Sequence, residues 1–130
     1  MGNNHNCIEL TIKCHTDCRH EIYPKKKKVK AFNVANTDGI FAVNKRVSGW
    51  AITHKPTGYI FIHSITNYYD AKKIAKCVYR CTQEKGLLEF LRSTSPHTIL
   101  INCKSVYVIA KDMRNKLNAK RQTKTNDKNV

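Results

Sequence analysis

Carboxylates are scarce in this chain of 130 residues. Nine aspartates and glutamates stand against 24 lysines and arginines, which gives a formal net charge of +15. No two of the nine share a recognisable motif, so a nuclease that holds two metal ions on clustered carboxylates is poorly supported. A positive balance of this size favours anionic partners, such as nucleic-acid phosphates, anionic lipid surfaces or acidic proteins.

Long apolar runs are missing as well. No segment approaches the roughly 20 apolar residues of a membrane-spanning helix, and the N-terminus is too polar for a signal peptide. We therefore expect no membrane association and a cytoplasmic location. Without an export signal, the six cysteines are expected to be reduced thiols. The abundance of lysine and asparagine indicates an AT-rich genome, as in a bacteriophage, a virus or a low-GC bacterium. The expected intracellular location therefore includes the cytoplasm of an infected host.

Motifs that identify a reaction are also absent. The chain has no glycine-rich phosphate loop, no nucleophile elbow and no histidine pair at metalloprotease spacing. A Cys–His pair from Cys18 or Cys103 with His54 or His63 is one alternative, and His63 alone is a candidate general base. We expect a protein that is not an enzyme and uses no cofactor, and we keep a zinc-dependent or Cys/His enzyme as an alternative.

One segment, residues 14–20, has the density of ligands that a metal site needs. A tetrahedral zinc site would take Cys14, Cys18 and His20, completed by Cys7 or His15. The second cysteine knuckle that marks zinc ribbons is lacking. The alternative is a polar loop whose thiols and imidazoles bind nothing.

Residues 38–80 predict a β-meander that leads directly into a helix. Asp38-Gly39 favours a tight turn, and strands are expected over 40–45, 49–54 and 59–64. In the turn at 55–58, proline and glycine are typical of a type I turn that closes with a bulge, which leaves three residues in the loop. That register pairs Thr53 with Phe61 and Ile52 with Ile62.

The predicted register separates two faces of the sheet. One face is a core of aliphatic residues and tryptophan: Trp50, Ile52, Ile60 and Ile62. The other is more aromatic and polar, and we expect it to be open: Thr53, Tyr59, Phe61 and His63. The alternative is that C-terminal segments cover this second face as a further core layer.

Flanking segments complete the expected fold. Strands are predicted near 7–13 and 29–34, and Asn67 caps a helix that ends before Gly86. Ser95-Pro96 begins another element, residues 98–103 favour a strand or an irregular segment, and a helix follows from about Ser105. We therefore predict a single α+β domain over residues 1–117, with an antiparallel β-meander of four to five strands and two to three helices packed on one face. A disordered basic tail is expected over 118–130.

Basic residues surround the predicted meander. The lysine run at 25–28 enters a strand, and lysines recur on the predicted helix, where the alternative is a solvated surface. Lysines contact phosphates, and aromatic rings on a sheet stack on unpaired bases. The candidate nucleic-acid-binding residues are Lys25, Lys26, Lys27, Lys28, Lys30, Lys45, Arg46, Lys55, Tyr59, Phe61, His63, Lys72, Lys73, Lys76 and Arg80.

The run Asp70-Ala71-Lys72-Lys73-Ile74-Ala75-Lys76, placed after successive strands, resembles parts of two families. The sheet-then-helix order is similar to AP2-type DNA-binding domains, and the Lys-Lys-x-Ala-Lys element resembles the last helix of double-stranded-RNA-binding domains. Both resemblances imply a meander packed on a helix beside a nucleic-acid backbone. The glycine-rich approach to the helix and the Arg- and Trp-rich sheet of these families are lacking.

These observations predict a small basic protein that binds nucleic acid, DNA in preference to RNA, chiefly through phosphate contacts. The main alternative is a phage- or virus-encoded interaction protein that binds an acidic host protein, or a host nucleoprotein complex, and inhibits it.

Overall fold

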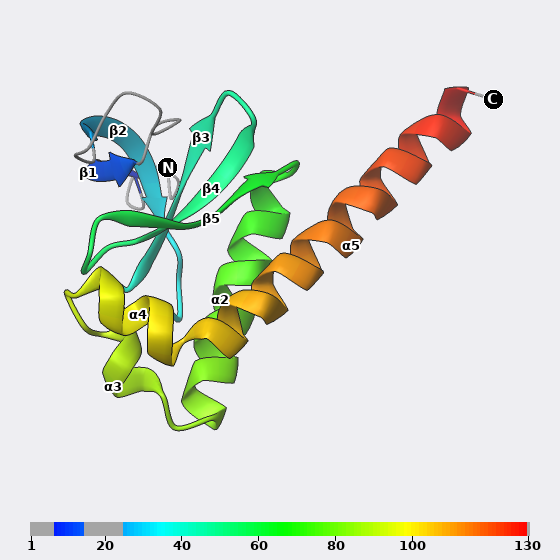
Figure 1. Ribbon diagram of the computed structural model, residues 1–130. Coiled ribbons are helices and arrows are strands. Elements are labelled where there is room, and N and C mark those ends of the chain that lie inside the picture. The colour runs from blue at the N-terminus through cyan, green and yellow to red at the C-terminus, as the bar shows by residue number, and fades with distance from the viewer. Residues whose placement is uncertain (1–6, 15–24, 130) are drawn as a thin grey trace.

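The computed structural model describes residues 7–14 and 25–129 (Figure 1). Five strands come first: β1 (Cys7–Cys14), β2 (Lys25–Asn33), β3 (Phe41–Arg46), β4 (Gly49–His54) and β5 (Tyr59–Ile65). The helices follow them: α2 (Tyr68–Glu84), α3 (Leu88–Leu91), α4 (Pro96–Asn102) and α5 (Lys104–Asn129). The predicted α+β class is confirmed, with four helices in the described chain where two or three were expected.

The strands form an antiparallel meander that closes into a barrel, because β1 also pairs in parallel with β5 at Lys13 and Tyr59. Helices α2 and α5 pack against each other and against the sheet, and the far end of α5 projects beyond the barrel (Figure 1). Within the described residues, no helix is long and apolar enough to cross a membrane.

The core lies between the sheet and these helices. Its buried side chains come from alternate strand positions and from one face of α2: Phe41, Val43, Ile52, Ile62, Ile65, Ala71, Ile74, Ala75 and Val78. The opposite face of β3 and β4, inside the barrel, carries small buried side chains: Ala42, Asn44, Ala51 and Thr53. The barrel interior is therefore narrow.

The turn between β4 and β5 differs from the prediction by one residue. His54 pairs with Tyr59, so the loop holds four residues, and Gly58 N–H donates to the His54 carbonyl at 2.8 Å. Thr53 consequently pairs with Ile60, so the predicted partner Phe61 was wrong, whereas the Ile52–Ile62 pair is confirmed. A side-chain contact stabilises this longer loop, because the His54 imidazole hydrogen-bonds the Thr57 hydroxyl at 2.9 Å.

Local capping overrides strand propensity at residues 98–103. The structure has α4 here instead of a strand, because the Ser95 hydroxyl accepts a hydrogen bond from Thr98 N–H at 3.3 Å and Pro96 starts the helix. The predicted cap at Asn67 is confirmed: its side chain accepts from Tyr69 N–H at 2.8 Å and from Asp70 N–H at 3.2 Å.

The C-terminal segment also differs from the prediction. Helix α5 continues to Asn129, where a disordered tail was expected from Asn118. Two contacts with the preceding part of the fold hold this extension. Asn118 accepts from Thr66 N–H at 3.1 Å and donates to the Ser64 carbonyl at 2.8 Å. One turn later, the Arg121 guanidinium donates to both carboxylate oxygens of Asp70, at 2.9 and 3.0 Å.

Candidate nucleic-acid interface

Four aromatic rings and two lysines meet where β2, β3 and β4 approach the start of α2. We call this group the aromatic–lysine cluster: Phe32, Trp50, Tyr68, Tyr69, Lys45 and Lys72. Ring centroids lie 4.9 Å apart for Trp50 and Tyr68, and 5.7 Å apart for Phe32 and Tyr68. The ammonium groups of Lys45 and Lys72 lie 5.9 Å from the Trp50 ring and 5.2 Å from the Tyr68 ring, at cation–π distance.

The sequence builds this cluster from three local devices. Lys45 and Trp50 are direct cross-strand partners, so their side chains share a face of the sheet. Tyr68 is the first residue of α2 and is positioned by the Asn67 cap. Lys72 follows Tyr68 by four residues, the spacing that places two helical side chains together.

Much of the cluster remains accessible to a ligand. The Tyr69 side chain is 71% exposed, Trp50 and Tyr68 are half-buried, and Lys45 is exposed. Lys28 and Lys30, both exposed, lie four and two residues before Phe32 on β2. Because every second residue of a strand points to the same face, they extend the basic surface on the face of Phe32. Lys28 lies 3.9 Å from the Glu9 carboxylate, and both side chains are largely exposed, so the pair is weak and the Lys28 ammonium stays accessible.

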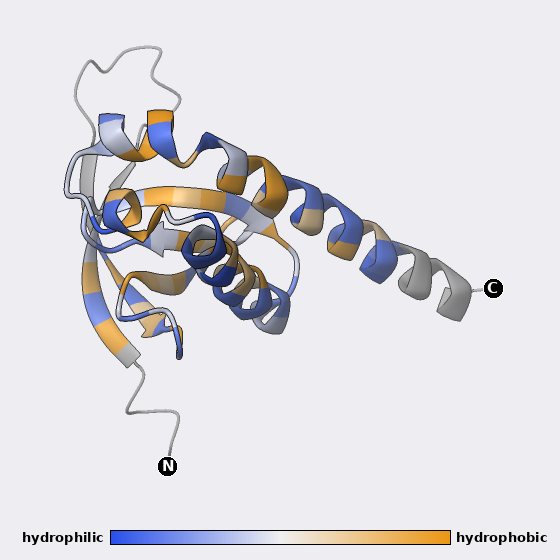
Figure 2. Ribbon diagram, turned by 90° about the horizontal axis from the view of Figure 1, so that it is seen from below, coloured by the Kyte–Doolittle hydropathy of each residue, from blue (hydrophilic) through white to orange (hydrophobic). Residues whose placement is uncertain are grey.

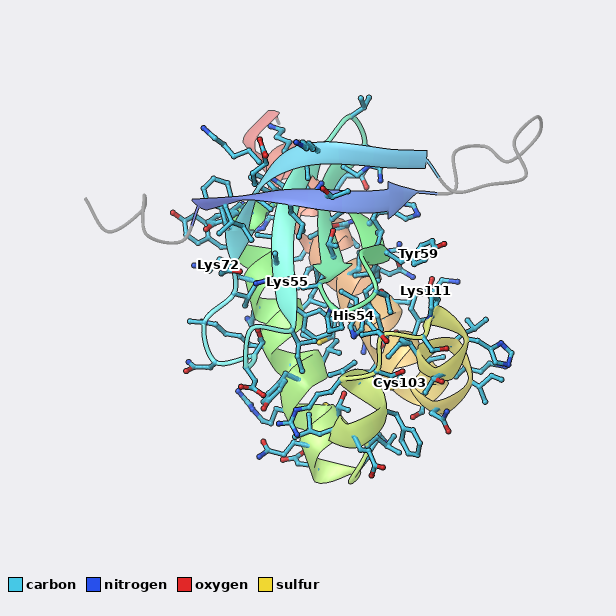
Figure 3. All side chains as sticks on the ribbon, turned by 90° about the vertical axis from the view of Figure 1, so that its left-hand side faces the viewer. His54, Lys55, Tyr59, Lys72, Cys103 and Lys111 are labelled. Carbon is cyan, nitrogen blue, oxygen red and sulfur yellow. The ribbon has the colours of Figure 1, made fainter. Side chains whose placement is uncertain are left out.

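The predicted aromatic face on β5 lies elsewhere and is not an open sheet surface. The centroid of Phe61 lies 5.5 Å from Phe41 and 5.8 Å from Tyr107 of α5, so a helix covers this ring. Tyr59, Phe61 and His63 instead line a groove between β5 and the C-terminal helices. Figure 3 shows Tyr59 and Lys111 on one side of the molecule and Lys72 on the other.

The other predicted basic residues are divided among several surroundings. Lys73 lines a small hollow with Lys120 and Arg121 of α5, on a different side of α2 from Lys72. Lys55 donates to the Asn33 side chain at 2.8 Å. The remaining three are placed as follows: Arg46 and Lys76 are half-buried and Arg80 is exposed.

Some predicted residues cannot be placed in a site. Lys25, Lys26 and Lys27 belong to β2, and Cys14 ends β1, but their side chains lie outside the described part of the chain. Cys18 and His20 of the zinc hypothesis lie outside the described residues altogether. Among the residues that the structure describes, no group of three or more histidines, cysteines or carboxylates could hold a metal ion.

The buried histidine and thiol are arranged as structural groups. His54 Nε2 donates to the Leu91 carbonyl, and Nδ1 accepts from the Thr57 hydroxyl, so both ring nitrogens are occupied. Burial lowers the pKa of His54, against a smaller raising effect of the Leu91 hydrogen bond. Burial also raises the pKa of the Cys103 thiol, which disfavours the nucleophilic thiolate.

The aromatic–lysine cluster was missed because Trp50 was assigned wholly to the core. The signal was present in the sequence, since Tyr68-Tyr69 stands four and three residues before Lys72. Comparison of the chain with protein-family models, with curated proteins and with solved structures found no match. Neither resemblance noted in the sequence is therefore matched by a family model.

Proposed function

We propose that this protein binds nucleic acid through the aromatic–lysine cluster. The observation that supports this most directly is the alternation of accessible rings and ammonium groups at one place, with Lys45 on Trp50 and Lys72 on Tyr68. Lysines neutralise phosphates, and aromatic rings stack on unpaired bases with little regard to sequence. The proposed ligand is therefore a single-stranded segment, of DNA first and of RNA as the comparison.

The charge of the chain supports the same assignment. Lys28 and Lys30 lead along β2 toward the rings, so a backbone that crosses the cluster meets positive charge before and after the stacked bases. Aromatic stacking contributes about 1–3 kcal/mol per base, and each phosphate contact on a single strand adds about 0.7 to the slope of log K against log salt. Binding should therefore be strong at low salt and fall steeply as salt rises.

Trp50 provides a direct test, because it is the only tryptophan in the chain. An oligothymidylate of about 15 nucleotides, the upper range of a small binding site, is titrated into the protein at two salt concentrations. We expect tryptophan emission to be quenched in step with binding measured by anisotropy of a labelled strand. Tyr69→Ala should weaken binding by about tenfold, and Lys72→Gln should lower the salt slope by about 0.7.

Two control variants test whether the loss of any positive charge or of any aromatic ring would weaken nucleic-acid binding equally. Lys85→Gln removes the same charge from the exposed C-cap of α2, and Tyr107→Ala removes a ring from α5, beyond the cluster. Both should bind nearly as the unmodified protein does. Binding without a change in Trp50 emission, or equal losses in test and control variants, would place the site elsewhere. Absence of binding to both DNA and RNA at low salt would refute the function.

A further inference from the structure

A second surface lies between β5 and the C-terminal helices. It is a groove of about 340 Å³. One wall carries Tyr59, Phe61 and His63 of β5, and the other carries Leu100 of α4 with Lys104 and Tyr107 of α5. The groove lies at the start of α5; further along, Arg114 and Asn118 still bind the end of β5, and the far end of α5 then projects beyond the barrel (Figure 1).

The groove presents large apolar side chains to solvent. Leu100, which lines it, is 71% exposed, and Tyr107 on the same wall is 38% exposed. Ile101 of α4 and Val108 of α5, next to these two in the sequence, are 58% and 55% exposed. Figure 2 shows hydrophobic segments in the half of α5 nearer the barrel and mostly hydrophilic ones further out. Large apolar side chains gathered at a concave site mark a surface that binds a partner.

The charges around the groove select the partner. No aspartate or glutamate lines it in the described chain, whereas Lys104 does, and Lys111 follows two helical turns later on α5. The neighbouring carboxylate of Asp112 is paired with Lys116 at 3.1 Å. The charge that lines this groove in the described chain is therefore positive.

We infer that the groove docks an acidic segment of a partner protein, one that inserts one or two large apolar side chains and pairs its carboxylates with Lys104 and Lys111. A second copy of this chain is a poor occupant, because two molecules of net charge +15 repel each other. Nucleic acid is a poorer occupant, because the exposed Leu100 side chain gives neither a stacking surface for bases nor a charge for phosphates, and Lys104 and Lys111 supply two cations. This surface is distinct from the aromatic–lysine cluster and does not depend on nucleic-acid binding.

The test uses the full chain and a fluorescein-labelled peptide of glutamates with one phenylalanine and two leucines spaced to share a helical face. Two comparison peptides carry alanine for the apolar residues or glutamine for the glutamates. We expect measurable binding of the first peptide by anisotropy, and losses of about tenfold or more for each comparison peptide. Leu100→Ser should weaken binding about tenfold, since this exposed leucine would be covered by the partner. Lys104→Glu should weaken it most at low salt.

Tyr69→Ala, on the other surface, should leave peptide binding unchanged, and circular dichroism should show that each variant is folded. The inference is overturned if the alanine peptide binds as well as the apolar one, or if Leu100→Ser has no effect. It is also overturned if sedimentation shows a dimer that Leu100→Ser dissociates, because the occupant is then a second copy. Displacement of the peptide by oligothymidylate in the Tyr69→Ala variant would assign the groove to nucleic acid.

Discussion

The stability of this protein should fall as the pH drops below about 6.5, and His54 is the reason. Its side chain is 2% exposed and fixed between the Thr57 hydroxyl and the Leu91 carbonyl. The Tyr59 amide donates to the Thr57 oxygen at 3.2 Å, and the Thr57 hydroxyl lies 2.9 Å from His54 Nδ1 and 3.3 Å from the His54 carbonyl oxygen. Protonation of Nδ1 would turn the hydroxyl from donor to acceptor and would place a positive charge in a buried site, which is costly.

The sign and the size of the effect follow from the direction of the pKa shift. Burial lowers the pKa of His54 in the folded protein, whereas the unfolded chain keeps the ordinary value of 6.5. Between these two values the unfolded state binds more protons, so the stabilising contribution is complete above pH 6.5 and is lost as the pH falls. Each pH unit in this window changes the free energy of unfolding by at most about 1.4 kcal/mol.

Urea unfolding followed by Trp50 emission measures this effect at pH 7.5 and 5.5. We expect the unmodified protein to lose stability between the two, by at most about 1.4 kcal/mol, and His54→Gln, which cannot titrate, to lose much less. His63→Gln is the matched control, because His63 is exposed, and it should keep the full pH dependence. Equal pH dependence in the unmodified protein and in His54→Gln would refute the reasoning.

Three further predictions follow from single contacts. Gly49→Ala should destabilise the fold by about 1–3 kcal/mol in urea unfolding, because its φ is +128° and a Cβ atom would lie 2.6 Å from the Ile65 carbonyl oxygen; an unchanged midpoint would contradict this. Arg121→Ala leaves the buried Asp70 carboxylate without its bidentate partner. Amide hydrogen exchange should therefore accelerate in the outer half of α5. Unchanged exchange would show that the contact does not hold the helix. Cys103 should react with a maleimide far more slowly in native than in urea-unfolded protein, since the thiol is 1% exposed and its pKa is raised; equal rates would contradict its burial.

The sequence predicted the elements whose bounds depend only on residues close together in the chain. The Asn67 cap, the Ser95-Pro96 helix start, the Gly86 helix end and the apolar face of α2 are all confirmed, because each depends on residues within one or two turns of each other. The end of α5 could not be predicted in this way. Its apolar period stops at Leu117, and the contacts that hold it join residues more than fifty positions apart.

The structure brings two of the candidate lysines together with aromatic rings other than those expected from the sequence. Lys45 and Lys72 belong to the predicted set and lie in the aromatic–lysine cluster, but the rings beside them are Trp50, Tyr68 and Tyr69 instead of those of β5. Strand alternation assigns a side chain to a face of the sheet. It does not show where a helix stops covering that face, so the half-exposed position of Trp50 could not be read from the sequence.

The position of Phe61 depends on the length of the turn between β4 and β5, and a β-bulge follows from it. Thr53 pairs with Ile60 and Ile52 with Ile62, so Phe61 is an extra residue on β5, a β-bulge. Simple alternation after Ile60, which pairs with Thr53 of the inner face, already turns Phe61 toward the helices, and the bulge returns Ile62 to the same side. A phenylalanine inside the barrel would have to fit among small side chains such as Thr53, which is fully buried. The turn therefore places Phe61 on the helix-facing side, the bulge keeps Ile62 on that side as well, and Phe61 also lines the groove.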